Sequence, residues 1–151
     1  MKKITLCFMV MVCLGATVFA QSNTLSGSQL ALRNNIQSFL KTEGFQPTID
    51  DDGDIKFKRQ GYNYYVKIYP ADDDPMFVQF SIYFNYSDDI TRTKIILFNS
   101  EHNYKMCKVF PANEYYVIRS ELYLTKSSSF TDIFYKILSV MDGLRDEIKK
   151  L

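Results

Sequence analysis

The chain has few of the residues that build metal centres and most catalytic sites. It contains one histidine, His102, and only one of its three cysteines, Cys107, lies beyond the first twenty residues. One histidine and one cysteine cannot supply the four ligands of a structural zinc site, and a lone cysteine cannot close an internal disulfide. A phosphate-binding glycine loop and the Gly-x-Ser-x-Gly turn of a hydrolase are also missing from the sequence. The sequence therefore predicts no metal and no cofactor.

An excess of charge of one sign is also missing. The 151 residues include 18 Lys and Arg and 17 Asp and Glu, which gives a formal net charge of +1. Loss of Lys2 and Lys3 with an N-terminal signal would leave 16 basic residues and a net charge of −1. Nucleic-acid binding requires a clustered excess of Lys and Arg to neutralise phosphates. The composition thus argues against a nucleic-acid partner, whether double- or single-stranded.

The N-terminus has the three parts of a secretory signal peptide, residues 1–20. Lys2 and Lys3 give a positive start, residues 4–19 form an uncharged apolar run, and Val18-Phe19-Ala20 places small or modest side chains where a signal peptidase cleaves. This run is shorter than the about 20 residues that a membrane span needs, and no similar run follows it. We expect cleavage, no membrane insertion afterwards and a periplasmic or secreted protein. An uncleaved N-terminal anchor is the alternative.

The remaining 131 residues of the 151 are enough for one hydrophobic core. Residues 21–27 are small and polar and predict a flexible lead-in, and residues 28–151 predict one domain. The domain opens with a helix capped by Ser28 that runs to about Glu43, where Gly44 supplies a left-handed stop. The apolar residues of this helix share one face, which is expected to pack on the core.

A second helix is predicted at about 89–102, capped by Ser87 or Asp88. Its apolar residues lie on more than one side. Packing within its own domain is the preferred explanation, and contact with a second subunit in a homodimer is the alternative. The last helix begins with a capping-box pattern, Ser129 with Asp132, and its long apolar stripe predicts a central place in the core.

Alternation of apolar and polar residues predicts strands between these helices. Asp52-Gly53 and Gln60-Gly61 predict tight turns, because these residue types tolerate positive φ. A short extended piece at 45–49 comes first. The strands are predicted at 55–58, 62–69, 76–86, 104–110 and 114–124. The result is an α+β domain in the order α-β-β-β-α-β-β-α, whose first three strands form an antiparallel meander.

This order and its residues resemble the YbjN-like proteins, which share the fold of type III secretion chaperones. The matching pieces are Phe39–Gly44, Ile49–Phe57, the Tyr-rich strand, Asp74–Val78, Leu97–Asn99 and the closing amphipathic helix. The resemblance covers nearly all of residues 28–151. It implies a twisted antiparallel sheet with the first and last helices packed on one face, often a dimer, and no enzymatic activity. The chaperone relatives bind client polypeptides in the cytoplasm, so the export signal argues against a secretion-chaperone role.

The acidic run Asp50–Asp54 has some features of a calcium loop. With Gly53 at the sixth position, however, the twelfth falls on Arg59 and not on the glutamate that the geometry needs. A hairpin turn is the preferred interpretation. Asp72–Asp74 is similarly interpreted as a solvated loop.

The best candidate for function is one face of the sheet. If the apolar set of each strand faces the helices, the opposite face carries tyrosines and basic residues. Tyrosine offers a large apolar area with one polar tip and loses little entropy on binding. Cross-strand stabilisation by the same rings is the alternative. The candidate protein-binding residues are Tyr65, Tyr69, Phe77, Tyr83, Tyr115, Arg119 and Tyr123.

A second hypothesis is a small hydrolase or thiol enzyme with a cleft near Glu101, His102 and Cys107. Its dyad would require the imidazole and the thiol to meet across a helix–strand boundary, and no third orienting group is evident. A helix-end histidine and a buried thiol are the simpler interpretation. The leading hypothesis is therefore an exported, non-enzymatic interaction module with a protein partner.

Overall fold

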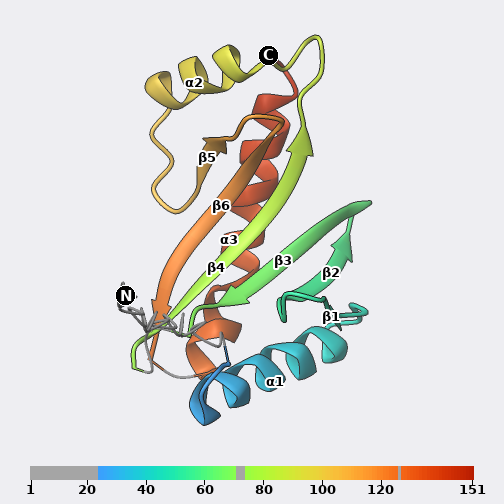
Figure 1. Ribbon diagram of the computed structural model, residues 1–151, viewed down its shortest axis with the longest axis vertical. Helices are drawn as coiled ribbons and strands as arrows, with labels where there is room; N and C mark the ends of the chain where they lie inside the picture. The colour runs from blue at the N-terminus through green and yellow to red at the C-terminus, as the bar shows by residue number, and fades with distance from the viewer. Residues whose placement is uncertain (1–23, 71–73, 126) are drawn as a thin grey trace, which may run out of the picture.

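A computed structural model describes residues 24–70, 74–125 and 127–151 (Figure 1). The predicted signal peptide lies outside these residues. The elements, in chain order, are α1 (Gly27–Thr42), β1 (Thr48–Ile49), β2 (Ile55–Arg59), β3 (Tyr62–Ile68), β4 (Met76–Asn85), α2 (Arg92–Glu101), β5 (Lys108–Pro111), β6 (Tyr115–Leu124) and α3 (Ser127–Ile148). The α+β class and the predicted order are confirmed. The two-residue β1 corresponds to the extended piece predicted at 45–49.

The start of α1 differs from the prediction. Ser26, and not Ser28, is the N-cap: its Oγ accepts from the backbone N–H of Gln29 at 3.4 Å, and its own N–H donates to Gln29 Oε1 at 2.8 Å. This reciprocal pair is a capping box in which glutamine takes the usual place of glutamate. Leu25 already packs against the core. The lead-in predicted for 21–27 is therefore wrong at its C-terminal end.

Three further boundaries are corrected. α2 begins at Arg92 because Thr91 Oγ1 accepts from the N–H of Lys94 at 3.3 Å, whereas Ser87 Oγ caps only the preceding turn through the N–H of Ile90. α3 begins at Ser127, two residues before the predicted Ser129. β5 covers Lys108–Pro111 and not the predicted 104–110. In each case the predicted helix or strand exists, but its first residue was predicted at the wrong position.

The six strands form one antiparallel sheet in the order β1-β2-β3-β4-β6-β5. The longest pairing joins β4 to β6 along their whole length, from Met76 opposite Leu124 to Asn85 opposite Tyr115. α2 is inserted between these two strands in the sequence and packs mainly against the edge strand β5. The two long strands therefore place residues that are 30 to 48 positions apart in the sequence side by side (Figure 1).

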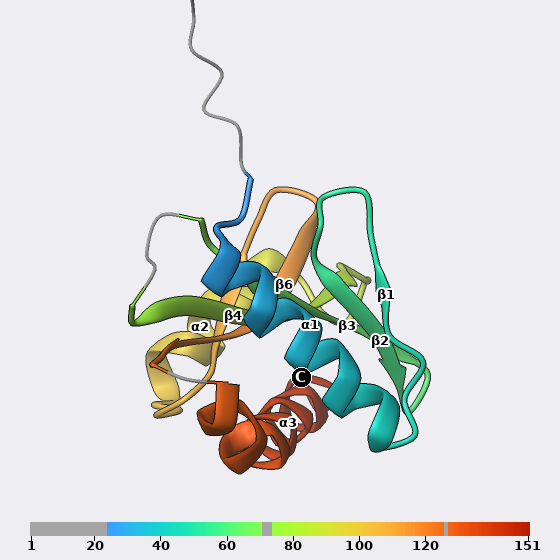
Figure 2. The ribbon, with the colours of Figure 1, turned by 90° about the horizontal axis from the view of Figure 1, so that it is seen from below.

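α1 and α3 lie on the same side of the sheet, as Figure 2 shows. The inward set predicted for β4 is confirmed: Met76, Val78, Phe80 and Ile82 are buried in the core, and Phe84 packs against it. The apolar stripe of α3 covers these residues and is itself buried. No helix of the described chain lies over the opposite side of the sheet, which we call the open face. It carries the outward side chains of β2–β6.

α2 buries Ile95 and Phe98 against its own domain, as preferred from the sequence. Its other apolar residues, Ile96 and Leu97, are exposed. Among the described residues, no helix is long and apolar enough to cross a membrane.

Candidate protein-binding face

Aromatic rings cross the open face in two rows. In the first row, which we call ladder A, Tyr65, Tyr83 and Tyr115 come from β3, β4 and β6. Their ring centroids are 5.5 and 5.7 Å apart, with interplanar angles of 82° and 60°. Lys56 Nζ lies 5.6 Å from the centre of the Tyr65 ring and ends the row on β2. Edge-to-face contacts of this kind fix the orientation of each ring.

The second row, ladder B, lies toward the other end of the same strands. It consists of Tyr69, Phe77 and Tyr123, with centroid distances of 5.0 and 5.1 Å. Tyr69 directly follows β3 and donates its backbone N–H to the carbonyl of Phe77 at 3.1 Å, so it continues the strand pairing. Lys67 Nζ lies 5.5 Å from the centre of the Tyr69 ring. Each ladder therefore joins three strands and ends beside a lysine.

Two buried polar side chains on β4, Gln79 and Ser81, separate the ladders. The Tyr69 hydroxyl donates to Gln79 Oε1 at 2.9 Å, and Gln79 Nε2 donates to Ser81 Oγ at 2.8 Å. Because the polar atoms of both residues are used within the sheet, this central band is itself hydrogen-bonded and rigid. The hydrogen bond from Tyr69 to Gln79 holds ladder B in a fixed position relative to β4.

Arg119 lies beside this band on β6. Its guanidinium carbon is 4.6 Å from the centre of the Phe110 ring, and its Nη1 donates to Glu121 Oε1 at 3.3 Å. Its buried Nε has no hydrogen-bond partner among the described residues. The guanidinium group is thus held over the Phe110 ring and keeps an N–H donor that is not used. A guanidinium group in this position suits recognition of carboxylates.

The structure brings all seven predicted binding residues to one face. Tyr83, Tyr115 and Tyr123 are 46%, 41% and 61% exposed, whereas the other four are half-buried. The rings thus stabilise the sheet and remain accessible at the same time. Phe110 and Lys108 on β5 also belong to this face and were not among the predicted binding residues. The sequence signal that could have found them is the alternation of apolar Cys107 and Val109 with Lys108. Because Cys107 and Val109 are buried, Lys108 and Phe110 point outward.

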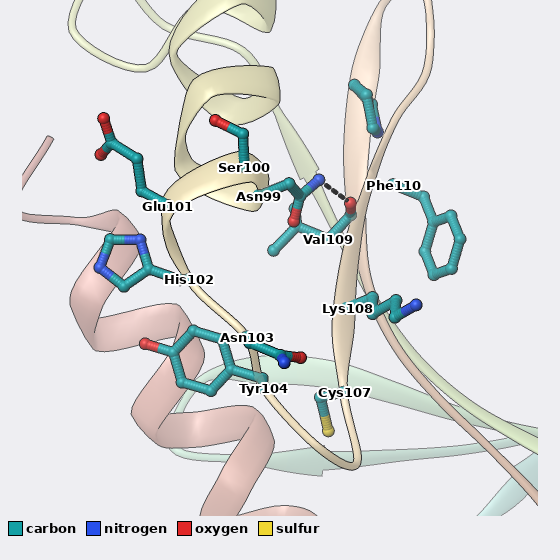
Figure 3. A pocket seen from close by; sticks show the side chains of 11 residues that line it. Asn99, Ser100, Glu101, His102, Asn103, Tyr104, Cys107, Lys108, Val109 and Phe110 are labelled. Carbon is teal, nitrogen blue, oxygen red and sulfur yellow. Dashed lines mark hydrogen bonds between the residues drawn. The ribbon is translucent and has the colours of Figure 1, made fainter.

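The second predicted site is a pocket of about 550 Å³ between the end of α2 and β5, and Glu101, His102 and Cys107 all line it (Figure 3). His102 Nδ1 lies 3.0 Å from the carbonyl of Phe98, and its ring stacks on Phe98 and Tyr104. In Figure 3, Asn103 and Tyr104 lie between the imidazole and the thiol. The pocket brings the three residues to one region but does not pair the imidazole with the thiol.

The thiol of Cys107 is not activated. Burial raises its pKa to about 11, and a hydrogen bond with Ser120 only partly opposes this. The nucleophile in cysteine chemistry is the thiolate, which this pKa makes rare at neutral pH. The geometry therefore agrees with the simpler interpretation, a helix-end histidine and a buried cysteine.

Cys107 should accordingly resist labelling. With iodoacetamide at pH 7.5, the peptide containing Cys107 should be modified at least about 100-fold more slowly in the native protein than in urea, because a pKa raised by two units lowers the thiolate fraction by that factor. Mass spectrometry of the digested protein measures the two rates. A native rate equal to or above the rate in urea would revive the thiol-enzyme hypothesis.

The acidic run forms a turn between β1 and β2, as preferred from the sequence. Asp50 Oδ1 accepts from the backbone N–H groups of Asp52 and Asp54 at 3.1 and 2.9 Å, and Gly53 has a φ of +85°. Burial raises the pKa of Asp54 to about 6, although the positive charge of Lys67, whose Nζ lies 3.8 Å from Asp54 Oδ2, opposes the shift. Within 24–70, 74–125 and 127–151, no group of three or more His, Cys, Asp or Glu could hold a metal ion.

Comparisons of this chain with protein-family models, with curated proteins and with solved structures gave no match. The resemblance to the YbjN-like proteins therefore stays a prediction. The case for a function depends on the geometry of the open face.

Proposed function

We propose that the protein is an exported, non-enzymatic module that binds a protein partner through the open face. The observation that supports this most is the arrangement of six aromatic side chains in ladders A and B, three of which are at least 41% exposed. Exposed aromatic side chains that gather on one face are typical of an interaction site.

The rings are already positioned before any partner arrives. Ring-to-ring contacts fix ladder A, and contacts together with the hydrogen bond from Tyr69 to Gln79 fix ladder B. A partner would therefore bury these side chains without paying for much lost rotamer freedom. Tyrosine is also one of the residues that most often dominate binding energy at protein interfaces.

Removal of single exposed rings tests the proposal. Tyr83→Ala and Tyr123→Ala should each weaken capture of the partner from the native envelope by about 10- to 100-fold, the usual effect of truncating an interface tyrosine. The measurement is quantitative mass spectrometry of proteins retained by the immobilised full-length protein and by its variants. Circular dichroism confirms that each variant is folded.

Tyr135→Ala is the matched control. Tyr135 is 50% exposed, much like Tyr83, but it lies on α3 and contacts Glu43 on the helical side of the molecule. Capture should be unchanged in this variant. If it lost the same proteins as Tyr83→Ala, or if Tyr83→Ala and Tyr123→Ala captured as much as the unaltered protein, the open face would not be the binding surface.

A further inference from the structure

We infer that the partner meets the open face with an acidic polypeptide segment. This inference rests on the proposed function and adds the chemistry of the ligand. It comes from the distribution of charge on the face, from the spacing of its cations and from the way in which its rings are oriented.

Charge is segregated on the molecule. The whole chain has a net charge of only +1, yet the outward positions of β2–β6 hold five cations and one carboxylate, Glu121. A second carboxylate, that of Asp54, directly precedes β2 and lies 3.8 Å from Lys67 Nζ, so five cations face two carboxylates. The basic residues of the face are Lys56, Lys58, Lys67, Lys108 and Arg119. A basic patch on a near-neutral protein favours an acidic partner and speeds its approach.

Three of these cations lie in one line across the strands. The register places Lys56 opposite Tyr65, Tyr65 opposite Ser81, Ser81 opposite Arg119, and Arg119 opposite Lys108. Neighbouring strands lie about 4.8 Å apart, so the Cα atom of Arg119 is about 14 Å, and that of Lys108 about 19 Å, from the Cα atom of Lys56. An extended peptide rises about 3.3 Å per residue, so carboxylates at positions i, i+4 and i+6 would match this spacing and would all point to the same side.

Arg119 is the best prepared of the three. Its guanidinium group is fixed over Phe110, and its present acceptor, Glu121, is an exposed side chain at 3.3 Å. Exposed ion pairs of this kind contribute little free energy, so a partner carboxylate can displace Glu121 at small cost. Lys108, directly opposite and exposed, adds a second positive charge at the same point.

The same observations disfavour two other occupants. A second copy of this chain, docked face to face, would bring the cation rows of both copies together, and like charges repel. A single-stranded nucleic acid needs free ring faces for base stacking. The rings of ladder A are instead engaged edge to face, at 82° and 60°.

Binding of three rhodamine-labelled peptides tests the inference. Each has twelve residues and alternates threonine with glutamate, glutamine or lysine. By fluorescence anisotropy at 50 mM salt, the Glu–Thr peptide should bind the full-length protein at least about tenfold more tightly than the Gln–Thr peptide, and the Lys–Thr peptide should not bind. The double variant Lys108→Gln/Arg119→Gln should weaken Glu–Thr binding about tenfold, and raised salt should do the same.

The control is Lys41→Gln/Lys136→Gln, which removes the same charge from the helical side and should leave Glu–Thr binding unchanged. Equal affinity for the Glu–Thr and Gln–Thr peptides, no effect of the Lys108/Arg119 variant, or tighter binding of a twelve-base oligo-dT would each overturn the inference. So would a dimer in sedimentation that the Lys108/Arg119 variant abolishes. If Tyr83→Ala still impairs capture in any of these cases, the proposed function stands and only the acidic partner is refuted.

Discussion

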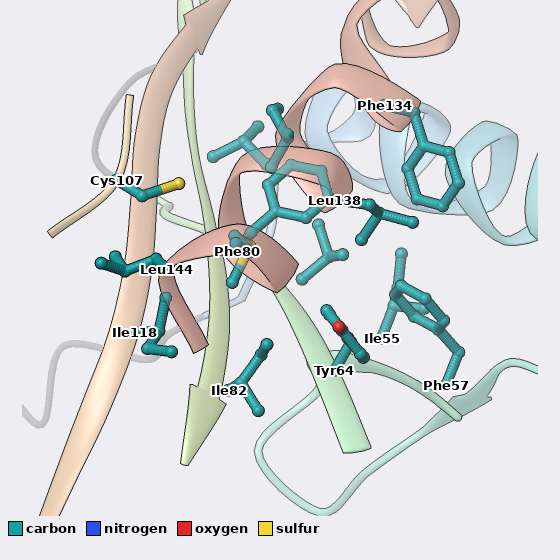
Figure 4. Packing of buried hydrophobic residues seen from close by; sticks show 14 of the residues in the cluster. Ile55, Phe57, Tyr64, Phe80, Ile82, Cys107, Ile118, Phe134, Leu138 and Leu144 are labelled. Atoms are coloured by element: carbon teal, nitrogen blue, oxygen red, sulfur yellow. The ribbon is translucent and has the colours of Figure 1, made fainter. Parts of the chain in front are cut away.

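Phe134→Ala is expected to lower the free energy of unfolding by about 3–5 kcal/mol, the usual cost of deleting a fully buried ring. Phe134 lies on α3, has 0% exposure and belongs to the buried cluster shown in Figure 4. Its ring centroid is 5.2 Å from that of Phe39 on α1, 6.0 Å from Phe57 on β2 and 6.4 Å from Phe80 on β4. One side chain therefore joins the two helices to two strands, and its loss leaves a cavity that none of them can fill alone.

Urea denaturation followed by circular dichroism at 222 nm measures this effect. Phe134→Leu should recover a large part of the lost stability, because leucine refills much of the cavity. Tyr135→Ala, at the adjacent and exposed position, should change the midpoint little. A loss below about 1 kcal/mol in Phe134→Ala would contradict the view that this ring is the centre of the core.

The fold was largely predictable because its periodicities are strong. The inward set of β4 and the apolar stripe of α3 follow from spacings of two and of three to four residues, and both are buried as expected. The ends of elements were less predictable. Ser26, Ser28, Thr91 and Ser87 are all competent caps by residue type, and only the hydrogen bonds of the folded chain decide that Ser26 and Thr91 begin the helices.

The composition of the open face was also predictable, but its arrangement was not. Alternation alone places Tyr83 and Tyr115 on the same side of the sheet. Their contact requires that β4 pair with β6 in the register that sets Asn85 opposite Tyr115. α2 and β5 separate these strands in the sequence, so no local turn fixes that register. The row of cations across the strands depends on the same long-range pairing.

A partly buried charged network between α3 and the turn from β2 to β3 was not predicted from the sequence. At its centre is Asp142, whose carboxylate accepts from Arg59, from Arg145 Nη1 at 2.9 Å and from the Tyr64 hydroxyl. Arg145 also donates to Gln60 Oε1 at 3.1 Å. Burial raises the pKa of Tyr64, so its hydroxyl keeps its proton and remains a donor at neutral pH. A single carboxylate thus accepts hydrogen bonds from two guanidinium groups and one phenol.

Asp142→Asn is expected to cost about 3–5 kcal/mol of unfolding free energy, as much as the loss of a central ring. The side chain of Arg145 is only 7% exposed, and removal of the carboxylate leaves its charge beside that of the half-buried Arg59 without the partner that both share. The Arg145–Asp146 ion pair cannot substitute, because the Asp146 side chain is 56% exposed and its carboxylate is well solvated.

A double-mutant cycle in urea separates charge balance from simple loss of contacts. If Asp142 acts mainly by neutralising Arg145, then Asp142→Asn/Arg145→Gln should lose clearly less stability than the sum of the single variants, with a coupling energy of about 1–3 kcal/mol. Asp146→Asn, which removes the exposed partner of the same arginine, should have a much smaller effect. Additive losses in the cycle, or equal effects of Asp142→Asn and Asp146→Asn, would mean that the network is held by packing and that its buried charge is not what stabilises the junction of α3 with β2 and β3.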